Sequence, residues 1–141
     1  MRSRERERGQ VLPMGLGLFI LILAVTGVAA DGTRAVLLRR SLQAAADAAS
    51  TGGAAAIDVQ SYYRSGGKEI ALDPASARQA ANSLLAARGP LADAASIEAD
   101  AERVRVVLRA EMPTLFLRLV GVSSVPVAAE AAAEPIPGPP G

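Results

Sequence analysis

The chain of 141 residues contains no cysteine and no histidine. Without cysteine there are no disulfides, thiolate metal sites or cysteine nucleophiles, and without histidine the commonest general base and metal ligand are missing. No phosphate-cradling glycine loop follows a predicted strand. We therefore expect no catalytic residues, no cofactor, no metal site and no small-molecule substrate, so the protein is predicted not to be an enzyme.

Aromatic residues and net charge are also scarce. The chain has two phenylalanines, two tyrosines and no tryptophan, and its formal net charge is +1. So small a charge, with arginines spread along the chain, does not indicate a nucleic-acid partner. A domain with so few large side chains builds its core from small ones and is expected to depend on a partner for stability.

The most informative segment is an uncharged apolar run over residues 10–30, which has 21 residues rich in Leu, Ile and Val. At about 1.5 Å per residue such a helix is roughly 31 Å long, close to the hydrocarbon thickness of a bilayer. A buried core helix is the alternative, but core helices rarely run so far without a polar face. The run predicts a transmembrane helix, with membrane lipid as its surroundings.

Charges on either side of this run predict its orientation. Residues 1–9 carry four arginines, and Asp31 follows the run directly. Arginine and lysine before the first span favour the cytoplasmic side. We expect a cytoplasmic basic leader over residues 1–9, the membrane boundary at Asp31 and an extracytoplasmic C-terminal domain. The expected location is therefore the cytoplasmic membrane, crossed once.

Two kinds of processing remain open. Val28, Ala29 and Ala30 satisfy the small-residue requirement of a signal-peptide cleavage site, and cleavage after Ala30 would release a secreted, soluble binding module. The apolar run is longer than the core of an ordinary signal peptide, which favours a retained span. Alternatively, removal of the leader after Gly9 would leave Gln10 as the first residue.

An amphipathic helix is predicted to extend the span over residues 31–60. Its apolar positions recur at close to the 3.6-residue period of a helix. The side chains at these positions become smaller along the helix, from leucine to alanine and glycine. They form a packing stripe made of Leu38, Leu42, Ala45, Ala49 and Gly53. Small residues allow close approach, either of the chain's own domain or of a helix from a neighbouring subunit.

Residues 61–134 are predicted to form a small α+β domain. Asp73 and Pro74 have the residue types of an N-cap and a first helical position, so a helix is expected over residues 74–88. After residue 91 the apolar period changes to two, which predicts two antiparallel strands that turn near residues 100–103. In that arrangement the acidic outer face of the first strand lies beside the basic outer face of the second.

The rest of the chain is predicted to contain a short helix, a strand and a tail. Residues 113–120 have amphipathic spacing that ends at Gly121, with Phe116, Leu119 and Val120 expected to anchor the helix in the core. Alternation returns over residues 125–134 and predicts a third strand. Residues 135–141, rich in proline and glycine, are predicted to be a disordered tail.

The first 57 residues also resemble a known family. The order of short motifs is similar to that of the N-terminal segment of TadE/TadG-like proteins, which belong to the tight-adherence (Tad, or Flp) pilus assembly system. The matching motifs are Arg8-Gly9-Gln10, Pro13, Asp31-x-x-Arg34, Leu37-Leu38-x-Arg40-x-Leu42-Gln43, Ala44-Ala45-Ala46-Asp47-Ala48-Ala49 and Gly53-Ala54-Ala55.

The resemblance implies a bitopic envelope protein of pilin-like architecture and a structural role. Family members are minor pseudopilins or accessory components that contact other pilus or secretion subunits, which here implies contacts through the N-terminal helix. Two features depart from the family. Met14 stands where processed pseudopilins usually carry glutamate, five residues after Gly9, and 141 residues leave no room for the large metal-dependent adhesion domain of full-length TadG-like proteins.

Overall fold

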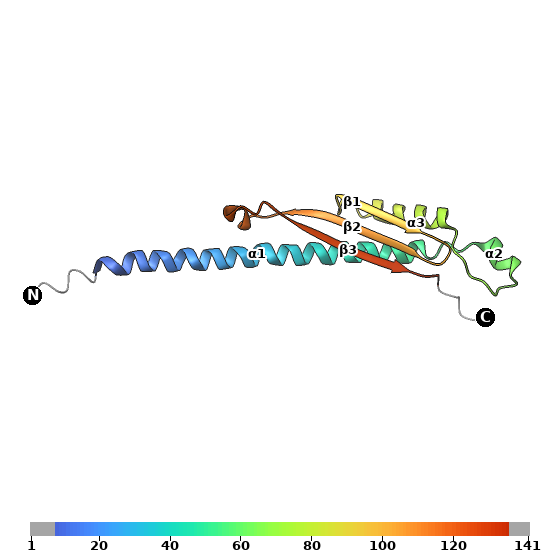
Figure 1. Ribbon diagram of the computed structural model, residues 1–141, viewed down its shortest axis with the longest axis horizontal. Coiled ribbons are helices and arrows are strands. Elements are labelled where there is room, and N and C mark those ends of the chain that lie inside the picture. The colour runs from blue at the N-terminus through green and yellow to red at the C-terminus, as the bar shows by residue number, and fades with distance from the viewer. Residues whose placement is uncertain (1–7, 136–141) are drawn as a thin grey trace, which may run out of the picture. The chain divides into compact units, whose positions relative to one another are not determined.

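The computed structural model describes residues 8–135 (Figure 1). These residues divide into two compact units. The helix–loop unit comprises residues 8–36 and Pro113–Val125, and the sheet unit comprises Leu37–Met112 and residues 126–135. Most of the predicted leader 1–9 and all but the first residue of the predicted tail 135–141 lie outside the described residues.

A single helix, α1, runs without interruption from Arg8 to Gly53 and contributes to both units. It passes through Ala30 and Asp31 with no break. The hydroxyls of Thr26 and Thr33 donate to carbonyls one turn earlier, at 2.8 and 2.9 Å, so these side chains do not interrupt the helix. The predicted span and its extension are therefore one element.

The extension is shorter than the predicted 31–60, because α1 ends at Gly53. Glycine is a poor helix former, and two glycines in succession end the helical run. A second helix, α2 (Val59–Arg64), then begins at Asp58, whose carboxylate accepts hydrogen bonds from the backbone N–H groups of Gln60 and Ser61 at 3.0 and 3.1 Å. Asp58 is thus an N-cap that the periodicity alone did not reveal.

The sheet has three antiparallel strands in the order β1 (Ala94–Ala99), β2 (Val104–Pro113) and β3 (Ser124–Ala133). The predicted turn is confirmed, since Glu98 pairs with Arg105 and Ala99 with Val104. Asp100 stabilises the turn by accepting hydrogen bonds from the backbone N–H groups of Glu102 and Arg103, both at 2.8 Å. An Asx-type turn explains why this hairpin needs no Asn-Gly pair.

Helices cover one face of the sheet. Every second residue of β2 and β3 is buried, whereas the residues between them are mostly exposed. The C-terminal part of α1 packs on this face within the sheet unit, and Figure 1 shows the strands running alongside it. Helix α3 (Pro74–Ala87), capped by Asp73 as predicted, lies against β1. The buried strand residues are Val104, Val106, Leu108, Ala110, Met112, Val127, Ala129 and Ala131. The α+β fold class is therefore confirmed.

Candidate functional site

The packing stripe of α1 lies largely inside the chain's own sheet unit. Leu42, Ala45 and Ala49 are at most 1 % exposed, Gly53 is also buried, and Leu38 is half-buried. The Gln43 amide nitrogen donates to the backbone carbonyl of Glu130 on β3 at 2.9 Å, which joins the same part of the helix to the sheet. The chain's own sheet unit therefore covers the packing stripe, the surface for which a helix of a neighbouring subunit was the alternative partner.

Two glycines bring α1 close to its neighbours in the sheet unit. A Cβ atom added at Gly53 would lie 3.0 Å from the carbonyl oxygen of Ala77 on α3 and 3.1 Å from Cγ1 of Val104 on β2. At Gly52 an added Cβ would overlap Cδ1 of Leu84. The missing side chain at Gly53 therefore permits the close approach of α1 to α3 and β2, whereas the contact at Gly52 involves only the flexible end of Leu84.

Asp31 lies in the helix–loop unit, where the sequence predicted a membrane boundary. Its side chain is 1 % exposed, and its carboxylate accepts hydrogen bonds from the backbone N–H groups of Leu115, Phe116 and Leu117 at 2.9, 2.8 and 2.9 Å. Three successive N–H groups directed at one carboxylate make a backbone nest for an anion. We call this arrangement the Asp31 clasp. It attaches the β2–β3 loop to α1.

The clasp also shapes the electrostatics of Asp31. Hydrogen bonds from Leu117 and Leu115, with further help from Phe116 and Arg34, lower the pKa of the carboxyl below its ordinary value of 3.8, although burial acts in the opposite direction. Arg34 lies 3.8 Å from the carboxylate and donates to the carbonyl of Pro113 at 3.4 Å. Asp31 is therefore ionised at neutral pH and holds the loop as an anion.

The β2–β3 loop is where the sequence-based expectation fails. A 3₁₀ helix, η1, occupies Leu117–Val120 and ends at Gly121, whose φ of 92° is in the left-handed region that favours glycine. Leu119 and Val120 were expected to be core anchors, but they are 84 % and 76 % exposed. Phe116 is also partly exposed and covers Gly27 of α1. The amphipathic spacing of residues 113–120 shows which apolar side chains belong together, but it does not show whether the protein core covers them.

The outer face of the sheet carries the predicted charge pairing. Arg105 on β2 lies 2.7 Å from the Glu130 carboxylate on β3 and 3.9 Å from that of Glu98 on β1. The hydrogen bond from Arg105 is the main reason that the pKa of Glu130 is lowered. All three side chains are substantially exposed, so water screens these pairs and they contribute little stability.

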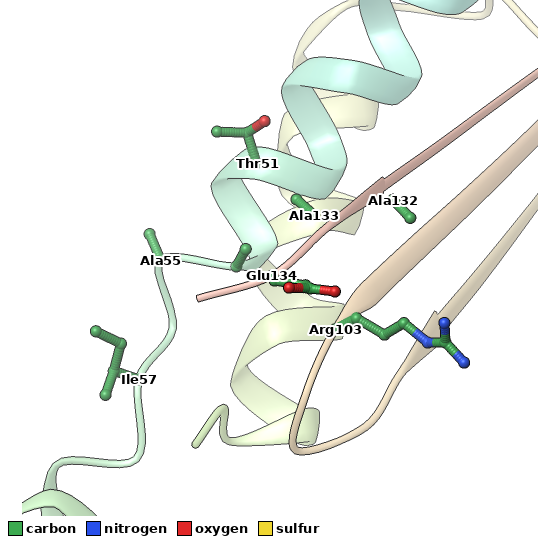
Figure 2. A pocket seen from close by; sticks show the side chains of 8 residues that line it. Thr51, Ala55, Ile57, Arg103, Ala132, Ala133 and Glu134 are labelled. Atoms are coloured by element: carbon green, nitrogen blue, oxygen red, sulfur yellow. The ribbon is translucent and has the colours of Figure 1, made fainter. Parts of the chain in front are cut away.

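A hollow of about 740 Å³ lies in the sheet unit, between the end of α1 and the ends of β2 and β3. Alanines make up four of its eight lining residues, and in Figure 2 the Arg103 side chain extends away from Ala55 and Ile57. Within residues 8–135 no group of three acidic, histidine or cysteine side chains could hold a metal ion. The charged groups that line the hollow are the guanidinium of Arg103 and the carboxylate of Glu134.

These features define a class of protein: an α+β chain with one helix that is long and apolar enough to cross a membrane, among the residues described. Residues 9–56, about a third of the chain, match the family model described as "Putative Flp pilus-assembly TadE/G-like". The resemblance to TadE/TadG-like proteins is thereby confirmed over that segment. No curated protein and no solved structure matches the chain significantly.

Proposed function

We propose that this protein is a membrane-anchored accessory component, similar to a minor pseudopilin, of a Tad/Flp-type pilus or a related secretion apparatus. The observation that carries the proposal is the uninterrupted helix α1. Its N-terminal part is apolar and uncovered, its C-terminal part is built into the sheet unit, and residues 9–56 match a pilus-assembly family. A structural component needs this combination of anchor and folded domain and needs no catalytic group.

Exposure of the apolar part of α1 supports its insertion in a membrane. The large apolar side chains from Val11 to Val28 are each between 50 % and 80 % exposed. A continuous apolar surface of this size is unfavourable in water, and helical backbone is one of the few structures that satisfies its own hydrogen bonds in lipid. With the arginine-rich segment in the cytoplasm, the sheet unit would lie on the opposite side of the membrane.

The alternative, a soluble module released by cleavage after Ala30, fits the structure less well. The cut would fall within a continuous helix and immediately before Asp31, whose carboxylate holds the β2–β3 loop. It would also remove Gly27, which Phe116 covers. A retained span keeps the whole contact surface of the helix–loop unit.

The decisive measurement is the intact mass and N-terminal sequence of the protein extracted from native membranes. We expect a chain that begins at Met1, and a start at Gln10 would instead indicate a processed pseudopilin that enters a filament. A soluble chain that begins at Asp31 would refute anchoring. Orientation is tested with Ser83→Cys, an exposed site in a chain without cysteine, which an impermeant maleimide should label in intact spheroplasts.

Contacts with other subunits are proposed to use the uncovered part of α1, because the packing stripe is occupied. No atom outside its own helical turn lies within 4 Å of a Cβ added at Gly15, so Gly15→Leu should leave the fold intact. Small residues allow membrane helices to approach closely. We expect Gly15→Leu to reduce co-purification of neighbouring pilus subunits and Leu18→Ile, the control, to preserve it. Equal recovery with both variants would contradict packing at Gly15.

A further inference from the structure

The β2–β3 loop carries an apolar surface that the proposed function leaves unexplained. Leu115, Phe116, Leu119 and Val120 are all exposed to some degree, and Leu119 is the most exposed of them at 84 %. Four large apolar side chains gathered on one short loop mark a binding surface.

The loop lies beside the end of the apolar span. The Asp31 clasp fixes it at the last turn before the charged part of α1, and Phe116 lies against Gly27, four residues back into the span. At about 1.5 Å per residue, Gly27 is roughly 6 Å from Asp31 along the helix axis. The apolar surface of the loop is therefore continuous with the surface of the span.

Many backbone N–H and C=O groups of the loop are already paired by hydrogen bonds within the protein, as an environment with little water requires. Asp31 accepts from three successive N–H groups, those of residues 115–117. Within the loop, the N–H of Thr114 donates to Ser123 at 3.1 Å and that of Val122 to Leu117 at 3.0 Å, while the Thr114 hydroxyl donates to the carbonyl of Val122. Backbone groups that enter lipid must be paired in this way.

Two arginines lie at the base of the loop and within it. Arg34, one turn beyond Asp31 on α1, donates to the carbonyl of Pro113 at the base of the loop. Arg118 is exposed within η1 itself. Long arginine side chains reach the headgroup layer while their stems lie along apolar surface.

We propose that the β2–β3 loop inserts Leu119 and Val120 into the outer interfacial layer of the same bilayer that α1 crosses, as a second, shallow lipid contact beside the span. This inference rests on the proposed anchoring. The occupant is lipid, because the loop's apolar surface continues that of a helix surrounded by lipid. Apolar side chains at such a boundary typically reach about 5–10 Å into the layer.

The chain has no tryptophan, so a single introduced one reports its own environment. We would compare Leu119→Trp with Tyr63→Trp, a site in the sheet unit that is 78 % exposed, and with Leu21→Trp in the middle of the span. The full-length variants are reconstituted in phosphatidylcholine vesicles that carry bromine at shallow or deep acyl positions. Val120→Trp repeats the loop measurement at a second exposed site.

We expect the emission of Leu119→Trp to shift to shorter wavelength and to lose intensity mainly with the shallow bromines. Leu21→Trp should be quenched mainly by the deep bromines, and Tyr63→Trp only by aqueous iodide. If the loop tryptophans respond to iodide as Tyr63→Trp does while Leu21→Trp is quenched by lipid, the loop inference is wrong and the anchor stands. If Leu21→Trp is not quenched by lipid, the anchor fails too. Loop tryptophans shielded from both quenchers would show that protein, such as a second copy, covers the loop, which also overturns the inference.

Discussion

Substitution of Ala49 by leucine is the sharpest test of the packing described for α1. Ala49 is completely buried in the sheet unit, and one turn later an added Cβ at Gly53 would already meet Ala77 and Val104 at 3.0–3.3 Å. There is no space for three additional carbon atoms in such surroundings. The same substitution at Ala44, which is exposed on the same helix, is the matched control.

The expected cost follows from this difference in burial. Overpacking a tight core typically costs about 1–3 kcal/mol, whereas exposed substitutions usually stay within about 0.5 kcal/mol. With a urea dependence of about 1–3 kcal/mol per molar for a small domain, Ala49→Leu should lower the urea midpoint by about 1 M. Ala44→Leu should leave the midpoint almost unchanged.

Pulse proteolysis of the full-length protein in detergent measures this midpoint, because a brief exposure to protease digests only unfolded domains. Equal midpoints for the wild type and both leucine variants would refute the claim that Ala49 packs against its own sheet. If Ala49→Leu kept its stability but no longer co-purified with pilus subunits, the stripe would have to face a neighbouring subunit.

Three other substitutions test the loop and the outer face of the sheet. Asp31→Asn should increase hydrogen exchange at the backbone amide of Leu115, because the asparagine side chain has one neutral acceptor oxygen where the carboxylate has two charged ones. Because the pKa of Asp31 is lowered in the folded protein, its stabilising effect is complete above about pH 4 and is lost as the pH falls further. Below about pH 4, exchange protection at the Leu115 amide should therefore decrease in the wild type and should not change in Asp31→Asn. Gly121→Ala forces alanine to adopt a φ of 92° and should destabilise the loop by about 1–2 kcal/mol, measured by the same exchange. Arg105→Gln, which removes the exposed bond to Glu130, should shift the urea midpoint much less than Ala49→Leu, and a comparable shift would show that the pair is not merely superficial.

Local signals in the sequence predicted much of the fold. Asp73 and Pro74 marked the start of α3, which begins at Pro74, and the change of apolar period marked the β1–β2 hairpin. These features depend on neighbours in the chain, so short patterns reveal them. The extension was predicted to reach residue 60 because the apolar period continues past Gly53, although the Gly52-Gly53 pair was a possible end or kink; α1 ends at Gly53, and Asp58 caps the next helix.

The Asp31 clasp could not be predicted in the same way. Its partners are backbone amides of the β2–β3 loop, 84 to 86 residues further along the chain, and backbone amides carry no side-chain signature. Burial of Leu119 and Val120 was wrongly expected for a related reason. A helical pattern reveals which side chains share a face, whereas the medium on that face depends on the rest of the molecule.

The long separation between Asp31 and its loop has a consequence for biogenesis. A ribosome that adds about 5–20 residues per second makes the loop amides roughly 4–17 s after Asp31. During that interval the Asp31 carboxylate lies beside the completed apolar segment without the backbone N–H groups that later bind it. Formation of the clasp is therefore a late step, and in a chain truncated before residue 113 the Asp31 carboxylate lacks the loop amides that hold it in the complete chain and is left to water.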